Sequence, residues 1–94
     1  MTSISRYVEA LLWMDRESPI DDAEFVVRLA RPSRWPAARF GPADVDRAAR
    51  SIRHDHYYLR DVVHDAEVTA RGAGVGIARL RRAVASIKRA ASDG

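Results

Sequence analysis

The sequence of 94 residues contains no cysteine, and Lys88 is its only lysine. The lack of cysteine excludes disulfide bonds and zinc sites built from thiolates. No apolar run approaches the roughly 18 residues that suggest a membrane-spanning helix. The first residues are followed directly by Glu9 and Asp15, a pattern that does not fit a signal peptide. We therefore expect a cytoplasmic protein that does not associate with membranes.

Sequence patterns of catalytic sites are also missing. The pairs His54-Asp55 and His64-Asp65 are similar to those of metal-dependent phosphohydrolases, but that fold needs a larger helical bundle and further ligands. The glycines from Gly72 to Gly76 precede a helix and could bind an anion. However, no Walker lysine or Rossmann strand accompanies them, so we interpret them as a hinge. No serine neighbours a plausible histidine–acid pair. We therefore predict no enzymatic activity, no metal and no cofactor.

The composition indicates one globular domain over residues 1–94, because 47% of the residues are hydrophobic and 31% are charged. The net charge is +3, and all but one of the basic residues are arginine. Residues 31–41 contain three arginines and no acidic residue, and residues 72–94 carry five basic residues against Asp93 alone. Residues 1–30 carry a net charge of −3 (three arginines, six acidic residues). Positive charge is therefore concentrated in one loop and in the C-terminal helix.

Hydrophobic periodicity predicts three helices within residues 1–55. The first covers residues 5–16. The second begins at residues 18–21 with capping residues and a proline, and we expect Pro32 to end it because proline cannot continue a helix. A proline-rich loop over residues 31–42 follows, and the third helix begins at Pro42. Its buried face is predicted to consist of Val45, Ala48, Ala49 and Ile52.

A last helix is expected between residues 73 and 91. Its apolar positions recur at steps of three and four residues, which is the spacing of a seam between helices. They are Ile77, Leu80, Val84 and Ile87. This seam either docks on the core of the same domain or joins two protomers in a homodimer, and the sequence leaves both possibilities open.

Residues 56–71 allow two interpretations. The stretch Tyr57–Val63 is rich in aromatic and β-branched residues, which is typical of a strand that could pair with a second strand in a hairpin. In the alternative, an all-α fold, the third helix continues as one long helix over residues 42–70. We favour the hairpin, because the long helix would place Asp55 or His56 in its apolar seam.

The hairpin interpretation gives three helices, two strands and a terminal helix. In that order, the segment Val68-Thr69-Ala70-Arg71-Gly72 and the arginine- and alanine-rich helix after it resemble the end of the wing in MarR- and PadR-like winged helix-turn-helix regulators. Residues Asp44–Arg53 similarly resemble the recognition helix of these proteins. The resemblance implies an α+β, mainly helical fold with a wing at residues 56–71.

The resemblance also implies a small transcriptional regulator that binds double-stranded DNA as a dimer. A recognition helix at residues 44–54 would read bases, and a basic loop at residues 31–39 would contact phosphates. The predicted DNA-binding residues are Arg31, Arg34, Arg39, Arg47, Arg50, Ser51, Arg53 and His54, and the predicted dimerisation residues are Ile77, Leu80, Val84 and Ile87. In a competing interpretation these arginines form a solvated face, paired with Asp44, Asp46 and Asp61.

A second class of function fits the same sequence. A short chain without a catalytic site can be a non-catalytic inhibitor or adaptor, of the type that phages and mobile elements encode, which docks on a host protein complex. The acidic first thirty residues and the tryptophans Trp13 and Trp35 favour this alternative. Aromatic and arginine side chains carry most of the binding energy at protein interfaces.

Overall fold

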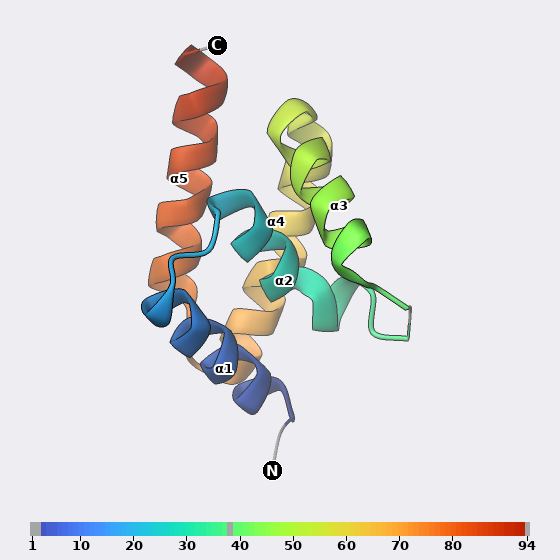
Figure 1. Cartoon of the computed structure of the whole chain (residues 1–94), viewed down its shortest axis with the longest axis vertical. Helices are drawn as coiled ribbons and strands as arrows, with labels where there is room; N and C mark the ends of the chain where they lie inside the picture. Colours follow the sequence, from blue (N-terminus) through green and yellow to red (C-terminus); the bar gives the residue numbers. More distant parts are fainter. Residues whose placement is uncertain (1–2, 38, 94) are drawn as a thin grey trace.

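The computed structural model describes residues 3–37 and 39–93, and over these residues the chain forms five α-helices and no β-strand (Figure 1). The helices are α1 (Ser3–Glu17), α2 (Asp22–Arg34), α3 (Pro42–His54), α4 (His56–Ala73) and α5 (Ile77–Asp93). The helices predicted at residues 5–16, from Pro42, and up to residue 91 are therefore confirmed, with small differences at their ends. Over the described residues, none of the helices has the length and apolar character needed to cross a membrane.

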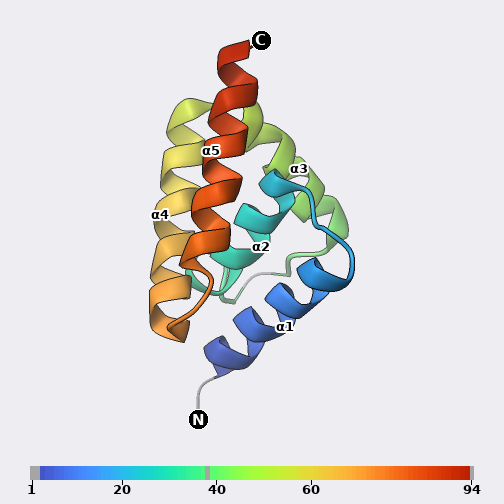
Figure 2. The same cartoon turned by 90° about the vertical axis from the view of Figure 1, so that its left-hand side faces the viewer.

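The helix α2 lies at the centre of the fold and contacts each of the other four described helices. Figure 2 shows α4 and α5 running antiparallel on one side of it, with α1 at the end where α5 begins. Six residues of α2 are buried and form one broad apolar face: Ala23, Phe25, Val26, Val27, Leu29 and Ala30. Glu24 and Arg28, which form an ion pair, mark the polar side of α2, and its apolar face is wide enough to pack against several neighbouring helices.

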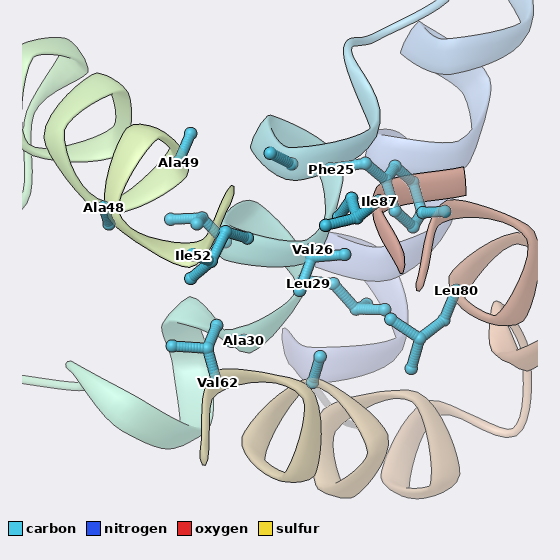
Figure 3. Packing of buried hydrophobic residues seen from close by; sticks show 14 of the residues in the cluster. Phe25, Val26, Leu29, Ala30, Ala48, Ala49, Ile52, Val62, Leu80 and Ile87 are labelled. Atoms are coloured by element: carbon cyan, nitrogen blue, oxygen red, sulfur yellow. The ribbon is translucent and has the colours of Figure 1, made fainter. Parts of the chain in front are cut away.

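The core is a single cluster in which side chains of α2 meet those of its neighbours (Figure 3). Phe25 and Leu29 of α2, Ile52 of α3, Val62 of α4 and Leu80 of α5 all belong to this cluster, and each is at most 2% exposed. The buried face of α3 is the predicted one, namely Val45, Ala48, Ala49 and Ile52. The stripe predicted from residue periodicity is therefore confirmed for this helix.

The predicted wing is wrong, because residues 56–71 belong to α4 rather than to a hairpin. The buried positions of α4 are Leu59, Val62, Ala66, Thr69 and Ala70. They recur every three to four residues, which is the helical period, whereas a half-buried strand would bury every second residue. The β-branched and aromatic composition of the segment is outweighed by this pattern, since strand propensity depends strongly on context. The α+β winged helix-turn-helix fold and the likeness to MarR- and PadR-like regulators are therefore not supported.

One continuous helix over residues 42–70 is also wrong, because Asp55 separates α3 from α4. Its backbone is extended, with φ −128° and ψ 102°, and its N–H still donates to the carbonyl of Ser51 at 2.9 Å. Its carboxylate accepts a hydrogen bond from the backbone N–H of Tyr58 at 3.0 Å and so caps the start of α4. Asp55 therefore ends one helix and begins the next, and no acidic residue enters an apolar seam.

Replacing Asp55 with alanine should lower the free energy of unfolding by about 1 kcal/mol, because an N-cap side chain is lost. Asp55→Asn is the matched control, since asparagine caps nearly as well and should lose much less stability. Urea denaturation followed by circular dichroism measures both variants. Equal stability of Asp55→Ala and the wild type would show that the cap does not hold the junction.

Pro32 does not end α2, contrary to the prediction, but lies inside its last turn. A proline lacks the N–H that would bond to the carbonyl four residues earlier, which here is that of Arg28. The hydroxyl of Tyr7 in α1 donates to this carbonyl at 2.6 Å instead. The α1 side chain thus satisfies the acceptor that Pro32 leaves open, and the helix continues to Arg34.

The glycine-rich segment forms the turn between α4 and α5. Gly74 caps α4 in the left-handed conformation (φ 74°), and Gly76 has a φ of 103°. A Cβ atom at Gly76 would lie 3.3 Å from Cγ1 of Val8 in α1. Glycine is required here both for the backbone conformation and for close contact with α1.

Candidate functional site

Three of the predicted DNA-binding arginines are held in ion pairs within the chain. The pairs join Arg34 to Asp65 at 2.9 Å, Arg47 to Asp44 at 3.0 Å and Arg53 to Asp21 at 2.6 Å. They point toward three different elements: α4, the first turn of α3, and the start of α2. Asp44 is one of the acidic partners expected for a solvated face, and it does pair with an arginine. The other two partners, Asp65 and Asp21, were not among those expected. Contacts with phosphate at these positions would first have to break ion pairs.

The other residues of that set are spread over α2, the loop after it and α3. Arg31 and Arg34 lie on α2, not in a loop, because the helix extends past Pro32. Arg31 stands over the Phe40 ring, 6.0 Å from its centre, and Trp35 stacks on Phe40 with 4.2 Å between ring centres. Trp35 therefore packs the loop against the domain. Arg39, Arg50 and His54 are exposed, and Ser51 is half-buried.

The predicted dimerisation seam is used inside the domain. Leu80 and Ile87 are 2% exposed and belong to the core cluster, and Ile77 and Val84 are half-buried against it. Of the two possibilities that the sequence left open, the described structure realises docking on the chain's own core. The outward side of α5 carries the basic residues instead.

An arginine at the start of α5 joins three helices. The Arg79 guanidinium donates to both carboxylate oxygens of Asp15 in α1, at 2.8 and 3.3 Å, and to Asp22 of α2 at 3.0 Å. It also donates to the carbonyl of Ile20 at 3.0 Å and lies over the Phe25 ring, 4.5 Å from its centre. The Arg79 and Asp15 side chains are only 10% and 14% exposed. No motif indicated this cluster, because its members lie about sixty residues apart in the chain.

The cluster lowers the pKa of an aspartate. Hydrogen bonds from Arg79 are the main cause that holds the pKa of Asp15 below its ordinary value, against the opposing effect of burial. At Asp21 burial disfavours the charged form, but hydrogen bonds from Arg53 and from the Glu24 amide outweigh it, so this pKa is lowered too. Both carboxylates therefore bind a proton less readily in the folded chain than in the unfolded one.

We expect the protein to lose stability in acid. A group with a depressed folded pKa stabilises the fold fully above its unfolded value, about 3.9 for aspartate, and this contribution disappears as the pH falls through the folded pKa. The free energy of unfolding should thus be nearly constant between about pH 5 and 7 and fall below about pH 4. Asp15→Asn should be less stable at pH 7, with a shallower fall in acid, in urea titrations at several pH values. A parallel fall in both proteins would contradict a role for Asp15.

The outer face of α1 carries an apolar group that faces away from the core. Trp13 is 57% exposed and Met14 is 45% exposed. Across from Trp13, Val75 of the turn before α5 is 38% exposed. Trp13, Val75, Ala10 and Leu12 line an open groove of about 770 Å³, which we call the Trp13 groove. Its charged lining consists of Arg6, Glu9, Arg16 and Arg82 together with the Asp15–Arg79 pair.

The Trp13 groove exists because α1 and α5 do not pack on each other. Within the described residues, no Cα atom of α1 lies within 8 Å of a Cα atom of α5. Both helices rest on α2 and α4, and the Arg79 side chain spans the space between them to reach Asp15. The Arg79–Asp15 ion pair therefore joins α1 and α5 across the space between their backbones.

A second groove, of about 390 Å³, lies between α4 and α5. Apolar side chains of Leu59, Val63 and Val84 line it, next to His56 and Lys88. Tyr57 beside it is 69% exposed, and Arg60 lies over its ring at 5.4 Å. In the described part of the chain, no group of three histidine or acidic side chains could hold a metal ion.

Comparison with known proteins adds no relative from which a role could be carried over. The chain matches no protein-family model, no curated protein and no solved structure.

Proposed function

We propose that the protein is a non-catalytic binding protein that docks on another protein through the Trp13 groove. The observation that carries this proposal is the exposed tryptophan Trp13 on the outer face of α1. Among described residues, the Trp13 ring stacks on no other ring and its indole N–H binds no acceptor, whereas Trp35 stacks on Phe40. The Trp13 side chain therefore contributes little to the stability of the domain.

Contact between the exposed apolar surface of Trp13 and water is unfavourable, and a bound partner would remove that surface from water. Tryptophan has a large apolar surface, and single soluble domains seldom leave apolar side chains clustered at a groove without using them for binding. Tryptophan and arginine are the side chains most enriched where binding energy is concentrated. In the Trp13 groove the two kinds occur together, since Arg16 and Arg82 flank Trp13 and Val75. Docking would block or tether the partner without catalysing a reaction.

Replacing Trp13 with alanine should abolish capture of the partner while leaving the fold intact. Loss of an interface tryptophan weakens binding by about 2 kcal/mol or more, which is about 30-fold. In pull-downs from a lysate of the cells that carry the gene, we expect the tagged wild type to retain one stoichiometric protein and Trp13→Ala to retain none.

Tyr57→Ala is the matched control, because Tyr57 is an even more exposed aromatic residue that does not line the Trp13 groove. It should retain the partner as the wild type does. Equal stability of all three proteins in urea would show that folding is not the cause of a difference. Retention of the same protein by Trp13→Ala would remove the Trp13 groove from the interface.

DNA binding is the second candidate function, and one observation favours it. The exposed side of α5 carries Arg81, Arg82, Lys88 and Arg89, and no ion pair within the described residues engages these side chains. A basic helix face can bind phosphates without reading sequence. Titration of a duplex at two salt concentrations tests this candidate. Binding that weakens steeply with salt would support it, and absence of binding at low salt would exclude it.

A further inference from the structure

The space between α1 and α5 suggests which structure the partner inserts there. Packed helices lie about 8–10 Å apart axis to axis, and a helix with its side chains is about 10–12 Å wide. The backbones of α1 and α5 are separated, yet both helices line the Trp13 groove. A third helix laid along the groove would contact both of them and complete the bundle on this side.

An extended partner segment fits this domain less well. Strand addition requires the open edge of a sheet, and the described chain contains no strand. A helix needs no backbone partner, because its hydrogen bonds are internal, and it presents an apolar stripe to a groove. The apolar lining of the groove, with Trp13 and Leu12 on α1 and Val75 opposite, matches such a stripe.

The charge around the groove is positive. Its lining contains four arginines and two acidic residues, Glu9 and Asp15, so the net charge is +2. Asp15 and Arg79 are engaged with each other, and Arg79 also with Asp22, which leaves Arg6, Arg16 and Arg82 against Glu9. Arg89 continues the positive charge along α5 in an adjoining hollow, where Asp21 and Asp22 are paired with Arg53 and Arg79. The groove is therefore positive although residues 1–30 are acidic overall.

We infer that the occupant of the Trp13 groove is an acidic amphipathic helix of the partner protein. This inference rests on the proposed function. The helix places an apolar stripe against Trp13 and Val75, and its acidic side chains lie near Arg6, Arg16 and Arg82. Complementary charges of this kind set the choice and orientation of a partner more than the total affinity.

Selection from a displayed library tests the inference with the full chain as bait. The library consists of helical peptides of about 20 residues, long enough to form a helix, with a varied apolar stripe and a polar face randomised among Glu, Lys and Gln. We expect the selected peptides to be acidic. Their binding should weaken at least about tenfold in Trp13→Ala and in the double charge reversal Arg16→Glu with Arg82→Glu.

Arg50→Glu with Lys88→Glu is the matched control, because it changes the net charge equally at exposed positions outside the Trp13 groove. This variant should bind the selected peptides as the wild type does. Selection of neutral or basic peptides, failure to select any, or equal weakening by both double variants would overturn the inference. The inference would also be overturned if duplex DNA displaced the selected peptides from the wild type and bound Trp13→Ala with unchanged affinity. The arginines would then bind nucleic acid rather than a partner helix.

The two proposals fail in different ways. If the pull-down partner depends on Trp13 but no acidic helix is selected, the helical occupant is wrong and docking through the Trp13 groove stands. If the partner is captured independently of Trp13, the proposed function itself is wrong.

Discussion

Replacing Arg79 with alanine is expected to lower the free energy of unfolding by about 3 kcal/mol, the loss typical when one member of a buried ion pair is removed. The variant removes the Arg79 hydrogen bonds to Asp22 and to the carbonyl of Ile20, and it leaves the Asp15 carboxylate with only the backbone N–H of Ile20 as a donor. Asp15 is the more affected of the two carboxylates, because its side chain is only 14% exposed and water reaches it poorly.

The expected loss is large for this chain. A domain of 94 residues has a total stability of about 5–14 kcal/mol, so a substantial part of it would depend on one side chain. Arg79→Lys is the matched control, since it keeps the charge but cannot bind two carboxylates and a carbonyl with one planar group. We expect an intermediate loss for lysine in urea denaturation. A loss below about 0.5 kcal/mol for Arg79→Ala, the range of ordinary surface substitutions, would contradict a structural role.

Replacing Phe25 with alanine is expected to cost about 3–5 kcal/mol, the range for removing a buried aromatic ring. Phe25 of α2 is fully buried, and Figure 3 shows it beside Ile87 of α5. Urea titrations give the free energy of unfolding of each variant, analysed with the same dependence on urea concentration for all of them. Phe25→Leu keeps most of the apolar volume and should lose much less. Equal losses for leucine and alanine would mean that filling the core is not the cause.

The losses of stability caused by Arg79→Ala and Phe25→Ala should not be additive, because the Arg79 guanidinium lies over the Phe25 ring. Residues in direct contact show coupling energies, and a cation over an aromatic ring contributes about 1 kcal/mol. The double variant should therefore lose less stability than the sum of the single losses. Additive losses would show that the ring and the guanidinium act independently.

Residue periodicity predicted the helices better than composition did. The stripe of α3, from Val45 to Ile52, is buried as its spacing predicts. In α4 the stretch Tyr57–Val63 has the composition of a strand, but Leu59, Val62 and Ala66 are spaced as in a helix, and burial follows the spacing. The deciding residue is Asp55: in one long helix it would enter the apolar seam, whereas in the structure it caps the start of α4. An N-cap residue needs a non-helical backbone conformation, and the pattern of hydrophobic residues does not predict that conformation.

The surface was predictable only in part. The sequence marked Trp13 as a possible interface residue, but the groove beside it needs Val75 and Arg82, which lie more than sixty positions further along the chain. The pairing of Arg53 with Asp21 was equally inaccessible, since nothing local indicates that the end of α3 meets the start of α2. Charge counts located the arginines, while the fold decided which of them are neutralised.

Burial of Trp13 in the complex is the most direct measurement of the proposed docking. The variant Trp35→Phe keeps an aromatic ring against Phe40 and leaves Trp13 as the single tryptophan of the chain. Docking through the Trp13 groove predicts that the retained partner, or a selected peptide without tryptophan, shifts the emission of Trp13 to shorter wavelength and protects it from a soluble quencher. Saturated binding with unchanged emission and unchanged quenching would contradict it.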